Sequence, residues 1–558
     1  MNDKELKKLK DDLWTTAIDM RANSNLSAHD YAEPILGLIF LRFADAKYKK
    51  FEKAIEEEFE KRQKSTRISA NKSEIALELA GIYVPDDARY DYLLNLPEKE
   101  DVIAPAIVNA MNEMERYASS VEEGTLPKEK YKEIPASNLK NLLKNFKDIP
   151  TEGSVDIFGE IYEYFLGKFA MAEGQGGGVF YTPASVVQYM VEVVQPKKGR
   201  ILDPACGSGG MFVQSALYAK KHGYGPNALR AYGVEKEPAT VKLAQLNLLL
   251  HNMNGDITQA NSFYEDPYNS YERFDYVFAN PPFNVRGVEY ERVCNQKRFN
   301  EYGIPRNSSK KDDIEKVPNA NYLWINQFAT ALKKDGKAAL VMPNGASTVG
   351  DGEQKEIRRR LLESGHVSQI VVLPSNMFNT VTLPATLWFF DKSKKHEEIL
   401  FINADKKELY TQVDRAHRKF DEAHIKNLSL ITRLYEENAQ EYEELKNWYQ
   451  ENIDLNDDQK EYWQKQLNWV NEQFPEGMYQ DIAGLCSVVP VHGENSIESK
   501  DWSLSPGVYV GFEQIEEDEE PFEVRMKRLT TMLSNQLSES HKLEEEVKKA
   551  LGGIGYEI

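Results

Sequence analysis

The sequence predicts an α/β protein in which a doubly wound parallel sheet is flanked by an N-terminal helical domain and a C-terminal helical region. Two observations support this fold class. From about residue 155 to residue 392, short apolar runs alternate with helical stretches, which is typical of a parallel sheet covered by helices. On both sides of this segment, apolar residues recur at the spacing of amphipathic helices.

Residues 1–150 are expected to form the helical domain. The chain opens with an amphipathic stripe that consists of Leu6, Leu9, Leu13, Ala17 and Met20. A second helix is expected over residues 34–62, which begin apolar and end highly charged. Because no alternating strand pattern interrupts this segment, we expect a helical bundle without chemistry of its own.

Residues 151–400 are expected to form the sheet domain. Its strands are predicted in the runs RILDPA, AYGVEK, FDYVFANPP, KAALVMPNG, SQIVVLP and ATLWFFDK. Sheets of this kind bind ligands beyond the carboxyl ends of their strands. The glycine-rich and polar motifs of the sequence lie at such ends.

Residues 401–558 are expected to form an acidic, mainly helical region that serves subunit assembly. Residues 434–475 are heavily charged, and the last helix carries an approximate apolar heptad that would pack on a partner helix. This heptad comprises Met526, Leu529, Met532, Leu537, Leu543, Val547 and Leu551.

Length and composition restrict the class of protein. A chain of 558 residues with 41% hydrophobic and 28% charged residues is expected to be soluble and to contain roughly two to four domains. No apolar run approaches the ~20 residues of a membrane span, and the N-terminus lacks the apolar core of a signal peptide. The widely spaced Cys206, Cys294 and Cys486 indicate a reducing compartment and argue against a disulfide framework or a metal site.

The net charge of −20 bears on partners. A protein that binds DNA alone usually presents a basic face, because phosphate neutralisation supplies most non-specific affinity. If this chain acts on DNA, a partner is expected to supply much of the binding. The exception is the basic segment 296–311, a candidate for phosphate contacts, with a solvated loop as the alternative. Its basic residues are Lys297, Arg298, Arg306, Lys310 and Lys311.

The run RILDPACGSGGMF, residues 200–212, predicts a strand, a glycine-rich turn and a helix start. Gly207, Gly209 and Gly210 allow the backbone to approach a ligand where a Cβ would collide. Neither the Lys-Ser/Thr pair of a nucleotide-phosphate loop nor a pyrophosphate-sized turn is clear in this run. Asp203 at the strand end instead favours a ligand with positive charge, such as an amino acid that carries a sulfonium.

Two further polar residues follow later strands. Glu235 is placed to accept hydrogen bonds from both hydroxyls of a ribose, although it lies 28 residues beyond Gly207 rather than the roughly 20 of a dinucleotide fold. A surface glutamate in a turn is the alternative. Asn261, in the run ANSF, is a candidate to bind an adenine edge.

The strand FDYVFA ends in Asn-Pro-Pro-Phe, residues 280–283. The prolines stiffen a turn that would present the side-chain carbonyl of Asn280 and the backbone carbonyl of Pro281 side by side. Two such acceptors would bind both hydrogens of one exocyclic amine and favour a pyramidal nitrogen in the transition state. Phe283 offers a flat face on which an extruded base would stack. A rigid strand-end turn with a packed phenylalanine is the alternative.

The run GGGVFYTP precedes the first strand. It joins a flexible glycine segment to a helix start in which Thr182 is the expected cap and Pro183 lies in the first turn. Aromatic residues beside this cap would close over a cofactor.

Together, GGGVFYTP, DPACGSGGMF, GVEKEP and FANPPF resemble, in this order and spacing, the adenine-N6 DNA methyltransferases. The chain most closely resembles the modification subunit of type I restriction-modification systems, because DDLWTTAIDMRANSNLSAHDYAEPILGLIFLRFADAKY and DWSLSPGVYVG are also similar to that family. The resemblance implies a Rossmann-like methyltransferase sheet. It also implies methyl transfer from S-adenosylmethionine to N6 of adenine in double-stranded DNA.

The resemblance assigns roles to particular residues. Asn280, Pro281 and Phe283 would be the catalytic residues that hold the target adenine. Together with Asp203, Gly207 and Asn261 from the motifs above, the S-adenosylmethionine site would comprise Val179, Phe180, Tyr181, Thr182, Pro183, Ala184, Ser208, Gly209, Gly210 and Glu235.

The family also implies partners. Two modification subunits are expected to assemble with one specificity subunit, which reads the DNA sequence, and a restriction subunit can join this complex. Such a complex acts in the prokaryotic cytoplasm, and no membrane is expected. The acidic stretch 434–475 is long for this family.

Two alternatives remain open. Protein glutamine methyltransferases place a similar turn against an amide nitrogen, but they typically end it in tyrosine, so Phe283 favours a nucleobase. The chain could instead be a cofactor-binding assembly subunit that is inactive without partners. In a mild form of this alternative, the isolated chain binds cofactor and methylates DNA poorly.

Overall fold

The computed structural model describes most of the chain in separate ranges. They are residues 3–22, 28–65, 70–118, 121, 123–150, 156–173, 182–306, 315–348, 350, 352–378, 384–414, 417–455, 457–512 and 522–553. These residues belong to two compact units, Met1–Val510 and Gly511–Ile558.

The N-terminal part of the first unit is helical, as the sequence predicts. Its described α-helices are α1 Asp3–Ala22, α2 Ala28–Ser65, α3 Lys72–Ala80, α4 Tyr90–Asn95, α5 Glu100–Tyr117, α6 Ala136–Lys147 and α7 Asp156–Glu173. In the predicted first stripe, Leu13 and Ala17 are buried. The neighbouring Trp14 packs edge-on against Phe165 and Phe169 of α7. The expected N-terminal helical domain is therefore confirmed.

A nine-stranded sheet follows, in the order β13-β10-β8-β9-β7-β4-β1-β2-β3. Strands β9 and β13 run antiparallel to their neighbours, and the remaining pairs are parallel. The strands are β1 Gly199–Asp203, β2 Leu229–Glu235, β3 Gly255–Gln259, β4 Phe274–Ala279, β7 Leu332–Pro343, β8 Val367–Val372, β9 Ala385–Asp391, β10 Ile399–Asn403 and β13 Cys486–Val489.

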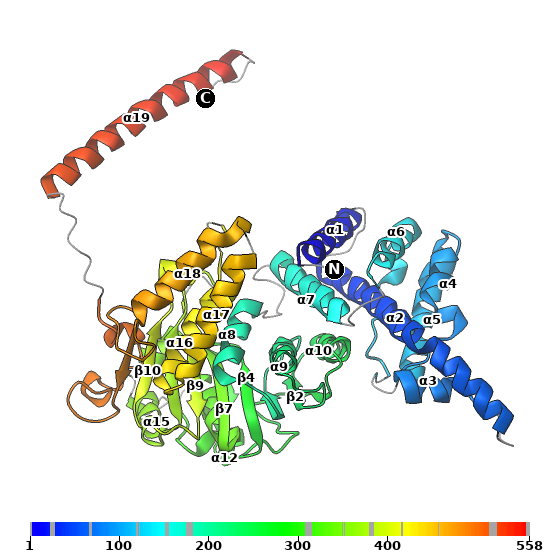
Figure 1. The fold of residues 1–558 in the computed structure, drawn as a ribbon, viewed down its shortest axis with the longest axis horizontal. Coiled ribbons are helices and arrows are strands. Elements are labelled where there is room, and N and C mark those ends of the chain that lie inside the picture. The colour runs from blue at the N-terminus through cyan, green and yellow to red at the C-terminus, as the bar shows by residue number, and fades with distance from the viewer. Residues whose placement is uncertain are drawn as a thin grey trace. The chain divides into compact units, whose positions relative to one another are not determined.

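Helices cover both faces of this sheet, so the doubly wound α/β fold is confirmed (Figure 1). One face carries α8 Ala184–Val194, α9 Gly210–Lys221, α10 Pro238–Leu250, α16 Glu422–Tyr435, α17 Ala439–Leu455 and α18 Lys460–Gln473. The other face carries α13 Asn321–Ala331, α14 Asn344–Thr348 and α15 Gly352–Glu363. The two faces bury separate apolar clusters, because every strand residue points to one face or the other.

Short elements connect these layers. Strand β5 Val288–Glu289 pairs with β6 Lys316–Val317, and β11 Thr411–Gln412 pairs with β12 Arg418–Lys419. The short helices α11 Tyr290–Val293 and α12 Lys297–Asn300 follow β5.

The helical part packs directly on the sheet domain through α10. Leu246 and Leu250 of α10 belong to the apolar core of the N-terminal helices. On α7, a Cβ added to Gly159 would lie 2.5 Å from His251 Nε2, so only glycine permits this close approach. The glycine-rich turn in front of α9 is thus supported by a helix that the N-terminal core also holds.

The sheet continues past the predicted domain boundary at residue 400. That boundary falls inside β10, and β13 adds a further strand at the same end of the sheet. Between them, the acidic stretch forms α17 and α18, which pack on α16 through buried residues such as Tyr449 and Val470. None of the helices in the described ranges is both long and apolar enough to cross a bilayer.

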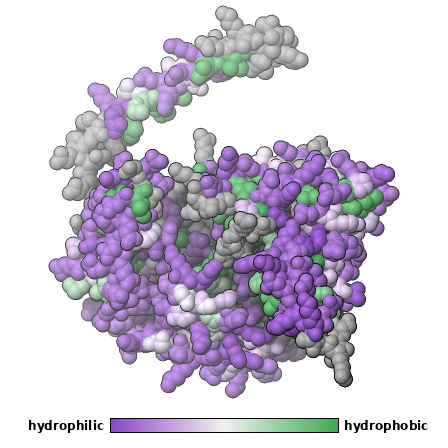
Figure 2. All heavy atoms as spheres, turned by 45° about the vertical axis from the view of Figure 1, so that its right-hand side comes forward, coloured by the Kyte–Doolittle hydropathy of each residue, from purple (hydrophilic) through white to green (hydrophobic). Residues whose placement is uncertain are grey.

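The second unit, Gly511–Ile558, contains one described helix, α19 Phe522–Gly553. Six of its seven predicted apolar positions are exposed to solvent, and the side chain of the seventh, Leu551, lies outside the described residues. Met526, Leu529, Met532, Leu537, Leu543 and Val547 are all at least 43% exposed. Figure 2 shows hydrophobic residues along this helix.

Candidate active site

The glycine turn connects β1 to α9 at the carboxyl edge of the sheet. Gly207 and Gly209 have φ angles of 52° and 81°, the left-handed region that side chains rarely adopt. At Gly210, no described atom lies within 4 Å of the position that a Cβ would take. The turn is therefore compact at its start and open where the helix begins.

A buried amide holds this turn from behind. Asn247 of α10 is completely buried, and its Nδ2 donates to the Ser208 carbonyl oxygen at 2.9 Å. Glu163 of α7 accepts a hydrogen bond from Gln214 Nε2 at 2.9 Å. Burial raises the pKa of Glu163 to about 7, against hydrogen bonds from Asn247 and Gln214 that lower it. Sequence reasoning missed Asn247 and Glu163, because helix residues far from the motif carry no local signal.

Two carboxylates face the same turn. Asp203, at the end of β1, is 1% exposed and accepts from the Ala205 N–H at 2.9 Å. Burial raises the pKa of Asp203 well above its usual range, and the neighbouring charge of Glu235 adds to this effect. Glu235, at the end of β2, accepts from Gly207 N–H at 3.1 Å and from the N–H groups of the two residues that follow it. A positively charged ligand would stabilise this acidic pair.

Asn261 reaches the same edge from β3. Its Oδ1 accepts from the Phe263 N–H at 3.1 Å, which fixes the turn. The neighbouring Ser262 hydroxyl donates to the Pro204 carbonyl of the glycine turn. The structure thus brings together Asp203, Gly207, Ser208, Gly209, Gly210, Glu235 and Asn261, as the sequence predicts for one site.

The Asn-Pro-Pro-Phe turn lies at the end of β4, the neighbour of β1. Asn280 is half-buried, and its Nδ2 donates to Thr182 Oγ1 at 3.1 Å. This bond joins two predicted motifs that lie 98 residues apart. Pro281 is buried, and the half-buried Phe283 packs against the core beneath one face of the sheet.

The predicted cap of α8 differs from the observed one. The helix begins at Ala184 with Pro183 at the N-cap, and no side chain caps it. Thr182 does not cap the helix, because its hydroxyl accepts the hydrogen bond from Asn280. Val179, Phe180 and Tyr181 lie outside the described residues.

The basic residues predicted to contact phosphate differ from one another in exposure and in hydrogen bonding. Arg298 does not present a free cation to solvent: it is 3% exposed, and its guanidinium donates to Gln296 Oε1 at 2.8 Å and to a backbone carbonyl. Lys297 is exposed, with its ammonium 5.4 Å from the centre of the Tyr271 ring. Arg306 is exposed and stacks on Tyr290. Lys310 and Lys311 lie outside the described residues.

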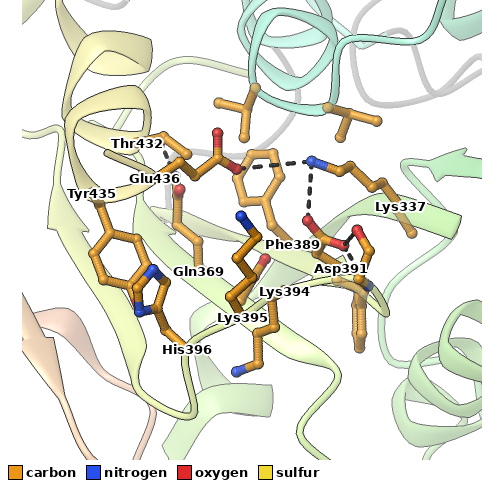
Figure 3. Close-up of a pocket in the computed structure, with 16 residues that line it drawn as sticks. Lys337, Gln369, Phe389, Asp391, Lys394, Lys395, His396, Thr432, Tyr435 and Glu436 are labelled. Atoms are coloured by element: carbon orange, nitrogen blue, oxygen red, sulfur yellow. Dashed lines mark hydrogen bonds and ion pairs between the residues drawn. The ribbon is translucent and has the colours of Figure 1, made fainter. Parts of the chain in front are cut away.

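A cavity of about 250 Å³ lies at the opposite, amino-terminal edge of the sheet (Figure 3). Lys337, which lines this cavity, forms ion pairs with Asp391 at 3.0 Å and with Glu436 at 3.8 Å. Lys337 is paired in register with Tyr276 near the start of β4, whereas Asn280 follows the end of that strand. This cavity is therefore separate from the two turns. In the part of the chain that the structure describes, no cluster of metal-ligating side chains occurs.

Family comparisons agree with this arrangement. The model of the N-6 DNA methylase family matches residues 153–518, and the model of the HsdM N-terminal domain matches residues 9–146. The type I restriction enzyme MjaIX methylase subunit of Methanocaldococcus jannaschii is 33% identical over 566 residues, which cover 98% of this chain and 91% of that protein. The chain belongs to the type I restriction enzyme methylase subunits.

Further relatives of this methylase subunit support the assignment. The HindI methylase subunit of Haemophilus influenzae is 32% identical over 73% of this chain and 80% of that protein. The crystal structure of a type I restriction-modification methyltransferase subunit from Streptococcus thermophilus shares the fold, with a TM-score of 0.67 at 20% identity over 90% of this chain and 99% of that chain. Membership in the N-6 DNA methylase family confirms the predicted enzyme class and leaves the glutamine methyltransferase alternative without support.

Proposed function

We propose that this methylase subunit transfers a methyl group from S-adenosylmethionine to N6 of adenine in double-stranded DNA, within a complex whose specificity subunit reads the sequence. One observation carries the assignment of the site. The 3.1 Å hydrogen bond from Asn280 to Thr182 joins the Asn-Pro-Pro-Phe turn to the start of α8, at the same sheet edge as the glycine turn. Asn280 is only half-buried, so it remains accessible to a substrate.

The chemistry of the glycine turn fits S-adenosylmethionine. This donor carries an amino-acid ammonium and a sulfonium methyl group, and it supplies an electrophilic methyl when bound. The acidic side chains of Asp203 and Glu235 are compatible with a positively charged ligand. Glu235 can accept further hydrogen bonds from a ligand, since a carboxylate offers about four acceptor positions. We assign the donor site to Asp203, Gly207, Ser208, Gly209, Gly210, Glu235 and Asn261, and we retain Val179, Phe180, Tyr181, Thr182, Pro183 and Ala184 as part of it from the sequence.

Asn280 and Pro281 hold the target amine in this proposal. Because Asn280 Nδ2 donates to Thr182, the Oδ1 atom is oriented for a substrate donor. Together with the Pro281 carbonyl, it accepts the two hydrogens of adenine N6 and favours the pyramidal nitrogen of the transition state. The rate then comes from positioning and from exclusion of water. The extra proton leaves after transfer, when the amine has become acidic.

Phe283 stacks on the extruded adenine in this proposal. A duplex base is accessible to a methyltransferase only after it leaves the stack, and an aromatic face compensates for part of the lost stacking. The exposed Lys297 and Arg306 are the described candidates for contacts with backbone phosphate beside the base.

Two features of the chain, its net negative charge and the exposed apolar residues of α19, indicate which partners it needs. A chain with a net charge of −20 gains little from DNA by itself, so a specificity subunit supplies most of the affinity. The exposed apolar stripe of α19 (Figure 2), which includes Met526, Leu529 and Leu543, packs on a partner helix in the assembled complex. We infer an assembly of two methylase subunits with one specificity subunit, which a restriction subunit can join, in the prokaryotic cytoplasm.

The test compares the isolated chain with the chain bound to its specificity subunit. We expect the isolated chain to bind S-adenosylmethionine in a calorimeter and to transfer little radiolabelled methyl to duplex DNA. The complex is expected to methylate adenine at N6 and to leave a glutamine-bearing release-factor peptide unmodified. Robust, sequence-specific methylation by the isolated chain would contradict the partner assignment. Methylation of the peptide, or the absence of donor binding, would contradict the function.

A further inference from the structure

The residue after Phe283 adopts an unusual backbone conformation. Asn284 has a φ angle of 56°, in the left-handed region where side chains other than glycine are uncommon. Asparagine tolerates this region better than most residues, but such conformations persist only where their surroundings enforce them. The chain therefore turns sharply directly beyond the aromatic ring of the Asn-Pro-Pro-Phe motif.

Two further asparagines enforce this turn. The Asn284 N–H donates to Asn321 Oδ1 at 2.9 Å. Asn284 Oδ1 accepts from Asn321 Nδ2 at 3.0 Å and from Asn319 Nδ2 at 2.9 Å. The Ala320 N–H adds a bond to the Val285 carbonyl oxygen at 3.0 Å. We call Asn284, Asn319 and Asn321 the asparagine clamp.

The clamp is anchored in the core of the molecule. Asn321 is 4% exposed and is the first residue of α13, a helix whose residues are all buried. The side chain of Asn321 is thus fixed by packing, and it holds a neighbouring turn that is more exposed. A long connection separates these parts in sequence, because Asn321 lies 37 residues after Asn284.

Helix capping accounts for only part of this network. Asn319 Oδ1 accepts from the Asn321 N–H at 2.9 Å, which is what a residue ahead of a helix does for the first turn. The other three side-chain bonds are made to Asn284 and satisfy no backbone group of α13. Their common effect is to fix the backbone immediately after Phe283.

We propose that the asparagine clamp positions Phe283 and thereby the extruded base for methyl transfer. The inference rests on the proposed function, because it assigns support to the same base-binding turn. Prolines 281 and 282 restrict the backbone before Phe283, and the clamp restricts it afterwards. A ring that is held from both sides presents a fixed face to the base, so little ordering is left for the moment of binding. The three asparagines are positioning residues, not groups that touch the reacting atoms.

The experiment uses the complex with the specificity subunit and compares Asn321→Ala with Asn326→Ala. Asn326 is a matched control: it lies on the same helix, is completely buried, and donates to two backbone carbonyls away from the turn. Three quantities are measured for each variant. They are the calorimetric Kd of S-adenosylmethionine, kcat and KM for methyl transfer to duplex DNA, and the fluorescence of 2-aminopurine at the target position.

Asn321→Ala is expected to lower kcat/KM for DNA by about 100-fold, as expected for a misplaced reacting group, and to lose the fluorescence increase of an extruded base. Its Kd for S-adenosylmethionine is expected to stay within about 2-fold of the wild type. Asn326→Ala is expected to lower thermal stability without changing the fluorescence signal.

Variants of Asn284 test the proposal if Asn321→Ala does not fold. Asn284→Asp keeps the side-chain oxygen that accepts both amide bonds, so it is expected to retain transfer within about 3-fold, whereas Asn284→Ala is expected to resemble Asn321→Ala. The proposal is overturned if Asn321→Ala or Asn284→Ala transfers methyl like the wild type, or if either loses donor affinity and DNA transfer in parallel. A wild-type complex that does not methylate DNA would instead contradict the proposed function.

Discussion

The two turns of the site lie at the ends of neighbouring strands, yet they are built differently. The turn after β1 relies on Gly207 and Gly209, whose left-handed backbones side chains rarely adopt. The turn after β4 relies on two prolines and on Asn284, whose left-handed backbone is held by side-chain amides. One turn lacks side chains, which in the proposed function admits a ligand, whereas the other uses side chains to stiffen the chain.

The supports of the two turns also come from different elements. The glycine turn is held by Asn247 of α10 and by Glu235 of β2. The Asn-Pro-Pro-Phe turn is held by Thr182 ahead of α8 and by Asn321 of α13. Because the supports share no side chain, donor binding and base positioning are expected to respond to different mutations.

The largest difference between the effect on methyl transfer and the effect on donor binding is expected for Asn280→Ala. Loss of the Oδ1 acceptor is expected to lower kcat by about 10²–10³-fold, because in the proposed function that atom accepts from the target amine in the transition state. The Kd of S-adenosylmethionine should stay within about 2-fold. Initial rates with radiolabelled donor and calorimetry measure the two quantities. Thr182→Val, which removes only the hydroxyl partner of Asn280, is expected to show a smaller loss of about tenfold.

Gly209→Ala is expected to affect the glycine turn and therefore donor binding. A side chain at a φ angle of 81° costs about 1–2 kcal/mol of folding free energy, and a displaced turn should weaken donor binding about tenfold. Gly223→Ala is the matched control, because Gly223 has the same φ of 81° and follows the far end of α9. Both variants should lower Tm similarly in a thermal melt. Equal donor affinity in the two would show that the glycine turn does not bind the donor.

Glu163 of α7 is hydrogen-bonded to Asn247, which holds the glycine turn, and it adds a pH dependence to stability. Its pKa is raised from 4.5 to about 7, so the folded state binds more protons than the unfolded state between these values. The contribution of this group to the free energy of unfolding is therefore largest below about pH 4.5. It decreases as the pH rises and is lost once the pH passes 7. The charges that act on it are those of Lys10, which lowers the pKa, and Glu160, which raises it.

Glu163→Gln is therefore expected to reduce the loss of stability between pH 5 and 8 by about 1–3 kcal/mol, measured by urea unfolding across that range. Glu160→Gln is the comparison on the same helix: Glu160 is 43% exposed and pairs with Lys10 at 2.8 Å, and loss of its charge should reduce the pH-dependent loss of stability only slightly, because burial is the largest cause of the raised pKa of Glu163. Identical pH profiles of stability for the wild type and Glu163→Gln would rule out ionisation of Glu163 as the source of the pH-dependent loss of stability.

The smallest effect is expected for the basic segment 296–311, which follows the Asn-Pro-Pro-Phe turn in sequence. Lys297→Ala should reduce the slope of log K against log salt by about 0.9 if its ammonium contacts one phosphate. The adjacent Arg298→Met should leave that slope unchanged and lower stability instead, because its buried guanidinium is hydrogen-bonded inside the protein. Fluorescence anisotropy with labelled duplex at several salt concentrations distinguishes the two variants. A reduced slope for Arg298→Met would show that burial does not prevent contact.

Local patterns were sufficient for much of the fold. Apolar runs of four to eight residues marked β1, β2, β4, β7, β8 and β9, and the expected helical domain is present. The strands β3, β10 and β13 were not predicted. GDITQ of β3 has a single buried residue, and ILFIN of β10 is an apolar run without a strand-specific period, so neither differs clearly from a loop or a helix segment.

By itself, the sequence determined which residues stand at strand ends, because an apolar run marks each strand and the polar, glycine or proline residues that follow the run mark its end. Asp203, Gly207, Glu235 and Asn280 were predicted in this way, and they lie at one edge of the sheet. Only the tertiary structure decided which distant side chains hold those turns. Asn247, Asn321 and Thr182 act across 37 to 98 residues, and the burial of Arg298 likewise depends on its neighbours in space. Backbone conformation is a local property of the chain, whereas hydrogen-bond partners and burial exist only after the elements have packed.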